Sequence, residues 1–330
     1  MTLSDVAKAA GVSLSTASRA INGSKDRTVN PELRERVLAA ATELRYAPNA
    51  AAQAIARGRS STLSLIVRDI TDPYFSVIAA GVSRAARTAG WTVILGITGQ
   101  DLSETVSLVE AARSHRSQGL VLVGGLRADA ETLSSIQSSI DDFRRSTGAG
   151  VALVGQPVLD VASVSPANRA GAAALARALV AQGHSAFAIL TGPRDHLTAK
   201  DRASGFVSGL GTKGKVVAKV EGDFTRDGGY AAMTELLASG ARPDVVFAVN
   251  DVMAVGALAA ARDAGVAVPG EVRVAGFDDI PTLRDIVPSL TTVRVPLETI
   301  GEAAVALAMG EEVDLAATQE YEVVLRDSTA

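Results

Sequence analysis

Residues 2–22 read TLSDVAKAAGVSLSTASRAIN, and this stretch decides the fold of the amino-terminal end. Thr2 followed three residues later by Asp5 is the pattern of a helix capping box. The apolar residues that follow recur at the spacing of one helix face: Leu3, Val6, Ala7 and Ala10. Gly11 supplies a left-handed turn position, and Ser13 can cap a second helix directly after it. The stretch therefore predicts a helix-turn-helix.

The second of these helices has a polar outer face. Its periodicity directs Val12, Ala17 and Ile21 inward. The outward side chains are mostly short and polar, with one guanidinium among them: Leu14, Ser15, Thr16, Ser18, Arg19 and Asn22. A DNA-reading helix needs such a face because its amino-terminal half must approach base edges closely. We therefore expect DNA contacts from these six residues and from the helix starts at Thr2 and Ser13. From this stretch alone, an ordinary helix pair with a solvated polar face is the alternative.

Two further helical segments follow. Asn30, just before a proline, begins a third helix with a buried stripe of Leu33, Val37, Ala41 and Leu44. Residues 48–58 read PNAAAQAIARG and predict a brief helix capped by Asn49. A helix this short is marginal alone in water, so we expect it to form only with a partner. Ala52 would let two copies approach, and Ile55 could wedge between base steps of DNA, so we expect Asn49, Ala52 and Ile55 to contact DNA. A plain alanine-rich linker is the alternative.

The positive charge of the chain is concentrated at this end. Residues 1–60 hold nine Lys or Arg and five Asp or Glu, a net charge of +4. The whole chain of 330 residues carries −4, so the remainder carries −8. Attraction to phosphate is thus confined to the amino-terminal end, where a DNA-docking module needs it.

The remaining residues predict an α/β body in two similar halves. Short apolar runs alternate with helix-like segments, which is typical of parallel sheets built from βαβ units. The first set of runs covers residues 63–67, 92–97, 119–123 and 151–154. The second set covers residues 186–190, 215–220, 245–249 and 272–276. Helices are expected over residues 77–89, 170–181, 228–237 and 252–263. A ligand between two such lobes is the expected arrangement.

Several classes of site and location are disfavoured. The chain has no cysteine, so it has no disulfide framework and no thiolate metal site. Its three histidines lack the spacing of metal ligands, and neither a metal nor a cofactor is expected. The amino terminus lacks the pattern of a secretory signal, and no apolar run reaches membrane-spanning length. We therefore expect a cytoplasmic protein that does not bind membranes.

The order of motifs resembles that of the LacI/GalR family of bacterial transcription regulators. The matching strings run the length of the chain: DVAKAAGVSLSTASRAING, PELRERVLAAATELRYAPNAAAQAI, DITDPYF, RASGF, FAVNDVMAVGAL, VRVAGFDDI and VVLRDSTA. The hinge departs from the family pattern, because Ile55 stands where Leu is usual and Gln53-Ala54 replaces an Arg-Ser pair. Leu14 and Ser15 occupy the positions that vary most with operator sequence in such proteins.

The resemblance implies a domain plan. An all-α helix-turn-helix headpiece would cover residues 1–46, and a hinge helix with its linker residues 47–60. A two-lobed body with parallel sheets, similar to periplasmic binding proteins, would cover residues 61–330. Its first lobe would hold about 61–160 and 291–318, and its second lobe about 161–290 and 319–330. The implied function is that of a repressor, not an enzyme, which binds a pseudo-palindromic DNA operator as a homodimer.

The resemblance also places a small-molecule effector between the lobes, with contacts at positions that match the family motifs. These positions are Tyr74, Phe75, His196, Thr198, Arg202, Phe224, Asn250 and Asp278. Aromatic faces can cover a ring, and acid, amide and guanidinium groups suit the hydroxyls of a sugar or polyol. The alternatives to effector contact are that Phe75 and Phe224 are buried core residues and that Arg202 forms a surface ion pair.

One phosphate-binding pattern is rejected, and one other class of protein stays open. Residues 209–214 match G-x-G-x-x-G, but they follow a predicted helix and lead into a strand, the reverse of the order a nucleotide loop requires. The alternative class is a sugar-binding protein or sugar-processing enzyme with an appended helical domain. Operator binding with a steep salt dependence would separate a regulator from both.

Overall fold

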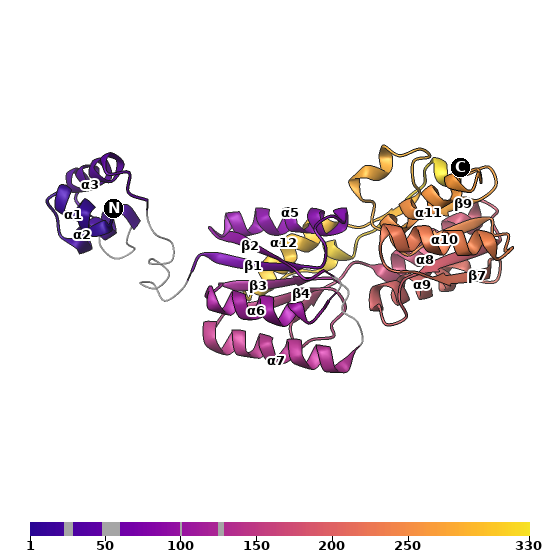
Figure 1. Cartoon of the computed structure of the whole chain (residues 1–330), viewed down its shortest axis with the longest axis horizontal. Coiled ribbons are helices and arrows are strands. Elements are labelled where there is room, and N and C mark those ends of the chain that lie inside the picture. Colours follow the sequence, from indigo (N-terminus) through magenta and orange to yellow (C-terminus); the bar gives the residue numbers. More distant parts are fainter. Residues whose placement is uncertain (23–28, 48–59, 100, 125–128) are drawn as a thin grey trace. The chain divides into compact units, whose positions relative to one another are not determined.

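The structure is a computed structural model that describes residues 1–22, 29–47, 60–99, 101–124 and 129–330 (Figure 1). The chain divides into two compact units, residues 1–60 and 61–330.

The amino-terminal unit is the predicted helical headpiece. It contains α1 (Leu3–Ala9), α2 (Leu14–Asn22) and α3 (Pro31–Glu43). These helices enclose a small core of buried aliphatic side chains: Val6, Ala7, Ala10, Ala17, Ala20, Val37 and Ala40. The predicted stripes of α1 and α2 face this core, with Leu3, Val12 and Ile21 half-buried against it. On α3, Val37 is buried and Ala41 and Leu44 are half-buried against the core, as predicted, while Ala40 is also buried and Leu33 is half-buried outside this cluster. The side chains are small, so the helices can pack closely within a short chain.

The first lobe of the body is a parallel sheet with helices on both faces. Its strands are β1 (Thr62–Val67), β2 (Thr92–Ile97), β3 (Gly119–Val123), β4 (Gly150–Val154) and β5 (Ala162–Val164). They pair in the order β2-β1-β3-β4-β5. Figure 1 shows α5 (Pro73–Thr88) and α12 (Leu297–Ala308) on one face, and α6 (Glu104–Ser114) and α7 (Ala130–Thr147) on the other. Because crossovers between parallel strands are right-handed, the connecting helices change from one face of the sheet to the other where the strand order reverses, which is beside β1.

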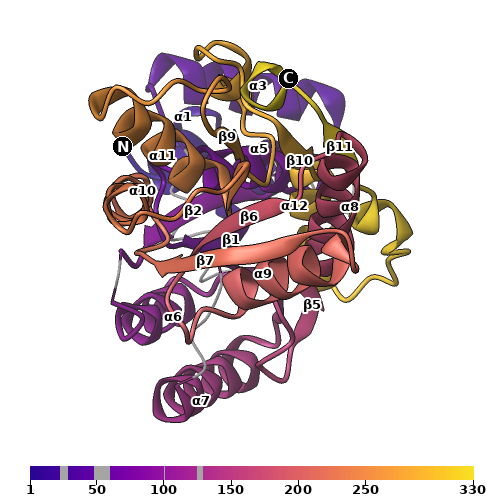
Figure 2. The same ribbon diagram turned by 90° about the vertical axis from the view of Figure 1, so that its right-hand side faces the viewer.

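The second lobe repeats the plan. Its strands are β6 (Ala186–Thr191), β7 (Lys215–Glu221), β8 (Val245–Ala248) and β9 (Arg273–Ala275), in the order β7-β6-β8-β9. Two pairs of packed helices cover the sheet, α8 (Asn168–Ala181) with α9 (Leu197–Leu210), and α10 (Arg226–Ala238) with α11 (Asp251–Asp263). Figure 2 shows α9 and α10 on either side of β7. The carboxyl ends of the strands are where such sheets bind ligands.

The carboxy-terminal segment crosses between the lobes, as the expected change of lobe near residue 291 implied. Strands β10 (Thr292–Arg294) and β11 (Glu322–Val324) pair antiparallel. Between them, α12 packs against α5 in the first lobe. Beyond them, Ser328 Oγ donates to the Val274 carbonyl in the second lobe. The lobes are therefore discontinuous in sequence.

The first lobe extends further than predicted. Strand β5 pairs with β4, so residues 162–164 belong to the first sheet and the boundary at about 160 is too early. The strands expected over residues 63–67, 92–97 and 119–123 were placed within a residue. The apolar pattern of the sequence did not predict β5, because a strand of three residues is too short to show a periodic pattern.

Glycines let paired helices of the second lobe approach closely. A Cβ at Gly209 would overlap the carbonyl oxygen of Ala173 on α8, and one at Gly256 would overlap that of Arg226 on α10. Gly209 belongs to the G-x-G-x-x-G pattern, which ends α9 and leads into β7, as the sequence predicted. The glycine at 209 thus serves helix packing rather than phosphate binding.

Candidate functional site

The turn between α1 and α2 is tightly fixed. Thr2 and Asp5 form the predicted capping box at the start of α1. Gly11 adopts a φ of +61°, in the left-handed region. Arg36 on α3 donates to the carbonyl of Ala10 over 2.6 Å. These contacts set the direction in which α2 leaves the turn.

The amino-terminal half of α2 presents the predicted DNA-contacting side chains. Ser13 Oγ accepts a hydrogen bond from the backbone N–H of Thr16 over 3.1 Å, so Ser13 caps the helix as predicted. Leu14 is 54 % exposed, so its side chain lies at the surface of the headpiece. Ser15 is also exposed, whereas Thr16, Ser18 and Arg19 are half-buried. An exposed leucine beside short hydroxyls suits close packing in a DNA groove.

Arg19 folds back along its own helix. Its Nε donates to the Ser15 carbonyl over 3.0 Å, and its Nη2 donates to Ser15 Oγ over 3.3 Å. These bonds hold the guanidinium beside Ser15. The backbone of Asn22 closes α2. Asn49, Ala52 and Ile55 lie outside the described residues, and their DNA contacts stay predictions.

The eight predicted effector residues line one cavity between the lobes: Tyr74, Phe75, His196, Thr198, Arg202, Phe224, Asn250 and Asp278. Arg68 and Asp72, which the sequence reasoning missed, complete its lining. The cavity has a free volume of about 20 Å³, room for about one water molecule. The structure therefore brings the predicted residues together in a cleft that their own side chains nearly fill. Their contact with an effector stays a prediction.

Arg202 and Asp278 form a buried ion pair at the floor of this cavity. Arg202 Nη2 lies 2.6 Å from Asp278 Oδ1 and Nη1 lies 3.0 Å from Oδ2, a bidentate geometry. Arg202 Nε also donates to Asn168 Oδ1, and the guanidinium lies over the ring of Phe277. The side chains are 1 % and 4 % exposed, so the pair is not the surface ion pair considered as an alternative.

Burial raises the pKa of ionisable side chains that line this cavity. It raises the pKa of Asp278 to about 6, although the Arg202 guanidinium opposes the rise. Burial likewise raises the pKa of Asp72, and Tyr74 N–H and Arg68 oppose that rise. Burial also raises the pKa of the Tyr74 phenol, which is therefore neutral and able to donate a hydrogen bond.

The turn that carries Asp278 is tied to the crossover strands. Asp278 and its neighbour Asp279 have φ values of 127° and 58°, which are costly for residues with a Cβ. Asp279 accepts hydrogen bonds from Arg326 over 2.6 Å and from Arg294 of β10 over 2.7 Å. The same turn thus contacts the cavity on one side and the interlobe connection on the other.

Aromatic rings form the walls of the cavity. His196 and Phe224 stack with centroids 4.2 Å apart and planes at 22°. Nδ1 of His196 accepts the Ala199 N–H and caps α9, so Nδ1 carries no proton. Phe75 is 3 % exposed and belongs to the core of the first lobe as well as to the cavity wall.

Polar groups at helix starts complete the lining. Asn250 Oδ1 accepts the Met253 N–H and caps α11, and Asp72 Oδ1 accepts the Tyr74 N–H and caps α5. Gln156, at the rim, accepts from Thr198 Oγ1 and donates to Asp201 across the lobes. The Asp72-Pro73 pair is a helix-start signal in the sequence and could have directed attention to this loop.

Comparisons with known proteins match both units. Residues 2–49 match the model of bacterial regulatory proteins of the lacI family, and residues 176–329 match a periplasmic binding protein-like domain. The chain is 34 % identical over 311 residues to the transcriptional repressor PurR of Erwinia tasmaniensis, covering 92 % of this chain and 88 % of the relative.

The chain belongs to the LacI family.

Other members of the LacI family are similar over the same extent. The ribose operon repressor of Escherichia coli is 32 % identical over 309 residues, covering 92 % of this chain and 91 % of that repressor. A crystal structure of the lac repressor dimer bound to operator and the anti-inducer ONPF has a TM-score of 0.85 and 26 % identity, covering 100 % of this chain and 99 % of the other. These LacI-family relatives are transcriptional regulators rather than enzymes.

Two features are absent from the described residues, a metal-binding cluster and a membrane-spanning helix. Within them, no group of His, Cys, Asp or Glu side chains is placed to hold a metal ion. No helix in the same part of the chain combines the length and hydropathy needed to cross a bilayer.

Proposed function

We propose that this chain is a ligand-controlled repressor that binds a pseudo-palindromic DNA operator as a homodimer. The observation that carries the proposal is the combination of an exposed α2 face with an interlobe cavity lined by all the predicted effector residues. Repressors that share both units along nearly the whole chain support it. Because bacterial operators lie in the cytoplasm, we place the protein there.

The chemistry of the cavity favours an uncharged, polyhydroxylated effector such as a sugar. Two guanidinium groups, Arg68 and Arg202, are balanced by the carboxyl groups of Asp72 and Asp278. A ligand with a large net charge therefore gains little from this set, whereas hydroxyl groups can pair with both donors and acceptors. The aromatic walls suit the C–H faces of a sugar ring.

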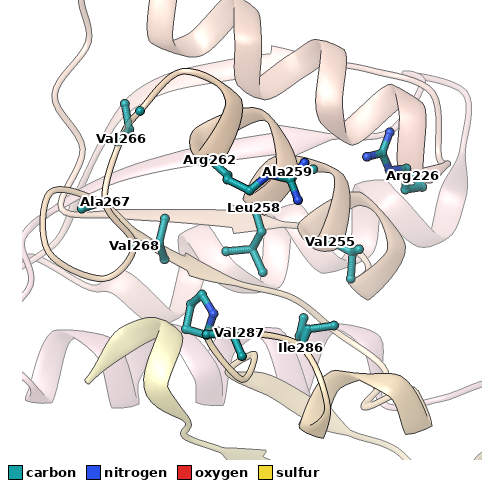
Figure 3. Close-up of a pocket in the computed structure, with 12 residues that line it drawn as sticks. Arg226, Val255, Leu258, Ala259, Arg262, Val266, Ala267, Val268, Ile286 and Val287 are labelled. Carbon is teal, nitrogen blue, oxygen red and sulfur yellow. The ribbon is translucent and has the colours of Figure 1, made fainter.

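Both lobes carry exposed apolar surfaces that suit a second copy of the chain. A groove of about 700 Å³ lies beside α11 in the second lobe, and Figure 3 shows Leu258, Val268 and Val287 around it. Val287 is 96 % exposed. In the first lobe the edge strand β2 exposes Ile94, Leu95 and Ile97 at 37 %, 43 % and 48 %. An exposed apolar edge strand offers a template for pairing with another chain.

The dimer is tested by Val287→Asp, which would bury a charge in the interface. We expect a shift toward monomer in light scattering and weaker operator binding, because two half-sites are no longer gripped together. Arg145→Ala, on the exposed face of α7, is the control. An unchanged dimer would remove the groove from the interface.

The regulator is tested with an operator selected from random duplexes by the full chain. A thermal-shift screen of sugars, polyols and nucleosides then identifies a ligand, and operator affinity is measured with and without it. We expect a steep fall in affinity with salt and a change on adding the ligand. Absence of any selected sequence would instead favour a sugar-binding protein or enzyme with an appended helical domain.

A further inference from the structure

Arg68 reaches across the cavity from one lobe to the other. It follows β1 directly in the first lobe, and its Nη2 donates to the carbonyl oxygen of Phe224 in the second lobe over 3.3 Å. Its guanidinium carbon lies 5.5 Å from the ring centroid of Phe75 and 5.6 Å from that of Phe224. Both distances are within the range of cation–π attraction.

The guanidinium occupies the space between the aromatic walls. Phe75 comes from α5 of the first lobe, while Phe224 and the stacked His196 come from the second lobe. With Arg68 in place the free volume is about 20 Å³, whereas ligand pockets usually enclose about 300 Å³ or more. A sugar ring can therefore enter only if Arg68 leaves or the lobes separate.

A second contact closes the other side of the cavity. Gln156 of the first lobe accepts from Thr198 Oγ1 over 3.2 Å and donates to Asp201 Oδ2 over 3.3 Å, both on α9 of the second lobe. These bonds are about as long as the 3.3 Å bond from Arg68 to the Phe224 carbonyl. Arg68 differs because its guanidinium also faces two aromatic rings, one from each lobe.

We propose that Arg68 is an internal ligand of the effector cavity, which holds the lobes together until an effector replaces it. The inference deepens the proposed function, because it names what the effector must supply. The effector must offer weakly hydrated faces to Phe75 and Phe224 and a hydrogen-bond donor to the Phe224 carbonyl. A ring with C–H faces and hydroxyl groups meets both needs; an apolar molecule lacks the donor.

The position of the lobes tests the proposal without knowledge of the effector. The chain has no cysteine, so Ser134→Cys on α7 and Lys200→Cys on α9 place one spin label on an exposed site in each lobe. Labelled chains are diluted with unlabelled chain, so that only distances within one chain are measured. Loss of a hydrogen bond to a charged group should raise the open-to-closed ratio on the order of tenfold in Arg68→Ala and Arg68→Gln.

The matched control is Arg84→Ala. Arg84 also lies in the first lobe, but it pairs with Glu298 and Glu302 within that lobe, so its removal should leave the distance distribution unchanged. If both Arg68 variants fold and give the parent's distribution, the proposal is overturned. If Arg68→Ala does not fold, Arg68→Gln decides.

Chemical rescue provides a second readout. Methylguanidinium added to Arg68→Ala should enter the vacated space, shift the distribution back toward the closed form and raise the melting temperature. Methylammonium at the same concentration lacks the planar face and should do neither. Equal effects of the two cations would contradict an internal-ligand role for the guanidinium.

Failure of this inference and failure of the proposed function are distinguishable. If Arg68 does not hold the lobes, the distances stay unchanged while the full chain still selects an operator. If the chain is not a repressor, no operator is selected while the Arg68 variants still open the lobes.

Discussion

Asp278→Ala should be strongly destabilising, because it leaves the Arg202 guanidinium buried without its counter-charge. Arg202 is 1 % exposed and donates to both oxygens of Asp278. Breaking a buried pair from one side typically costs about 3–5 kcal/mol. For a body of this size that corresponds to a fall in melting temperature of roughly 6–20 °C. Urea denaturation and calorimetry of the full chain measure both quantities.

The double variant gives the sharper test. Arg202→Leu combined with Asp278→Ala removes both charges, so it should be less destabilised than Asp278→Ala alone. The control is Arg145→Ala, whose pair with Asp142 is exposed and should contribute less than about 1 kcal/mol. The reasoning is refuted if Asp278→Ala costs no more than this control, or if the double variant loses the sum of the two single losses. Because Asp278→Ala is expected to destabilise the fold, it is a poor probe of effector binding. Thr198→Val, at the rim of the cavity, should be used for that purpose.

Three further variants test other parts of the account. Arg19→Ala should weaken binding to the selected operator by roughly 5- to 150-fold and relax specificity at one base pair, measured by fluorescence anisotropy across salt. Burial raises the pKa of Asp251 to about 8. The stability contributed by protonated Asp251 is therefore complete below the pKa that Asp251 has in the unfolded chain, and it is lost as pH rises through about 8. Asp251→Asn should flatten that decline in pH-dependent denaturation; an equally steep decline would show that another group causes it. Gly209→Ala places a Cβ against the Ala173 carbonyl and should cost roughly 1–3 kcal/mol of unfolding free energy, whereas exposed Ser208→Ala should cost almost nothing.

The sequence predicted the elements whose signals are local. Residues 63–67 and 119–123 could be predicted as strands because buried parallel strands are continuous apolar runs bounded by turns. Strand β5, with three residues, gives no such run, and its membership of the first sheet depends on a partner, β4. The headpiece was predictable because Thr2, Asp5 and Gly11 specify caps and a turn within a few residues.

Eight of the ten residues that line the candidate cavity were predicted, but the pairing of their side chains was not. Polar and aromatic residues after strands converge because parallel strands end at one edge of each sheet. Arg202 and Asp278 are 76 residues apart, and no local pattern shows that each satisfies the other. Arg68 and Gln156 were missed for a related reason. Their partners lie on the opposite lobe, and the sequence does not show how far apart the two lobes are.

Arg68 allows the dependence of operator affinity on the state of the interlobe cavity to be tested without an effector. Operator affinity is measured for the parent, Arg68→Ala and Arg84→Ala at one salt concentration. If lobe opening and DNA binding are coupled, Arg68→Ala must change the affinity several-fold while Arg84→Ala leaves it unchanged. Equal affinities for all three, with the lobes of Arg68→Ala shown to be open, would contradict the coupling.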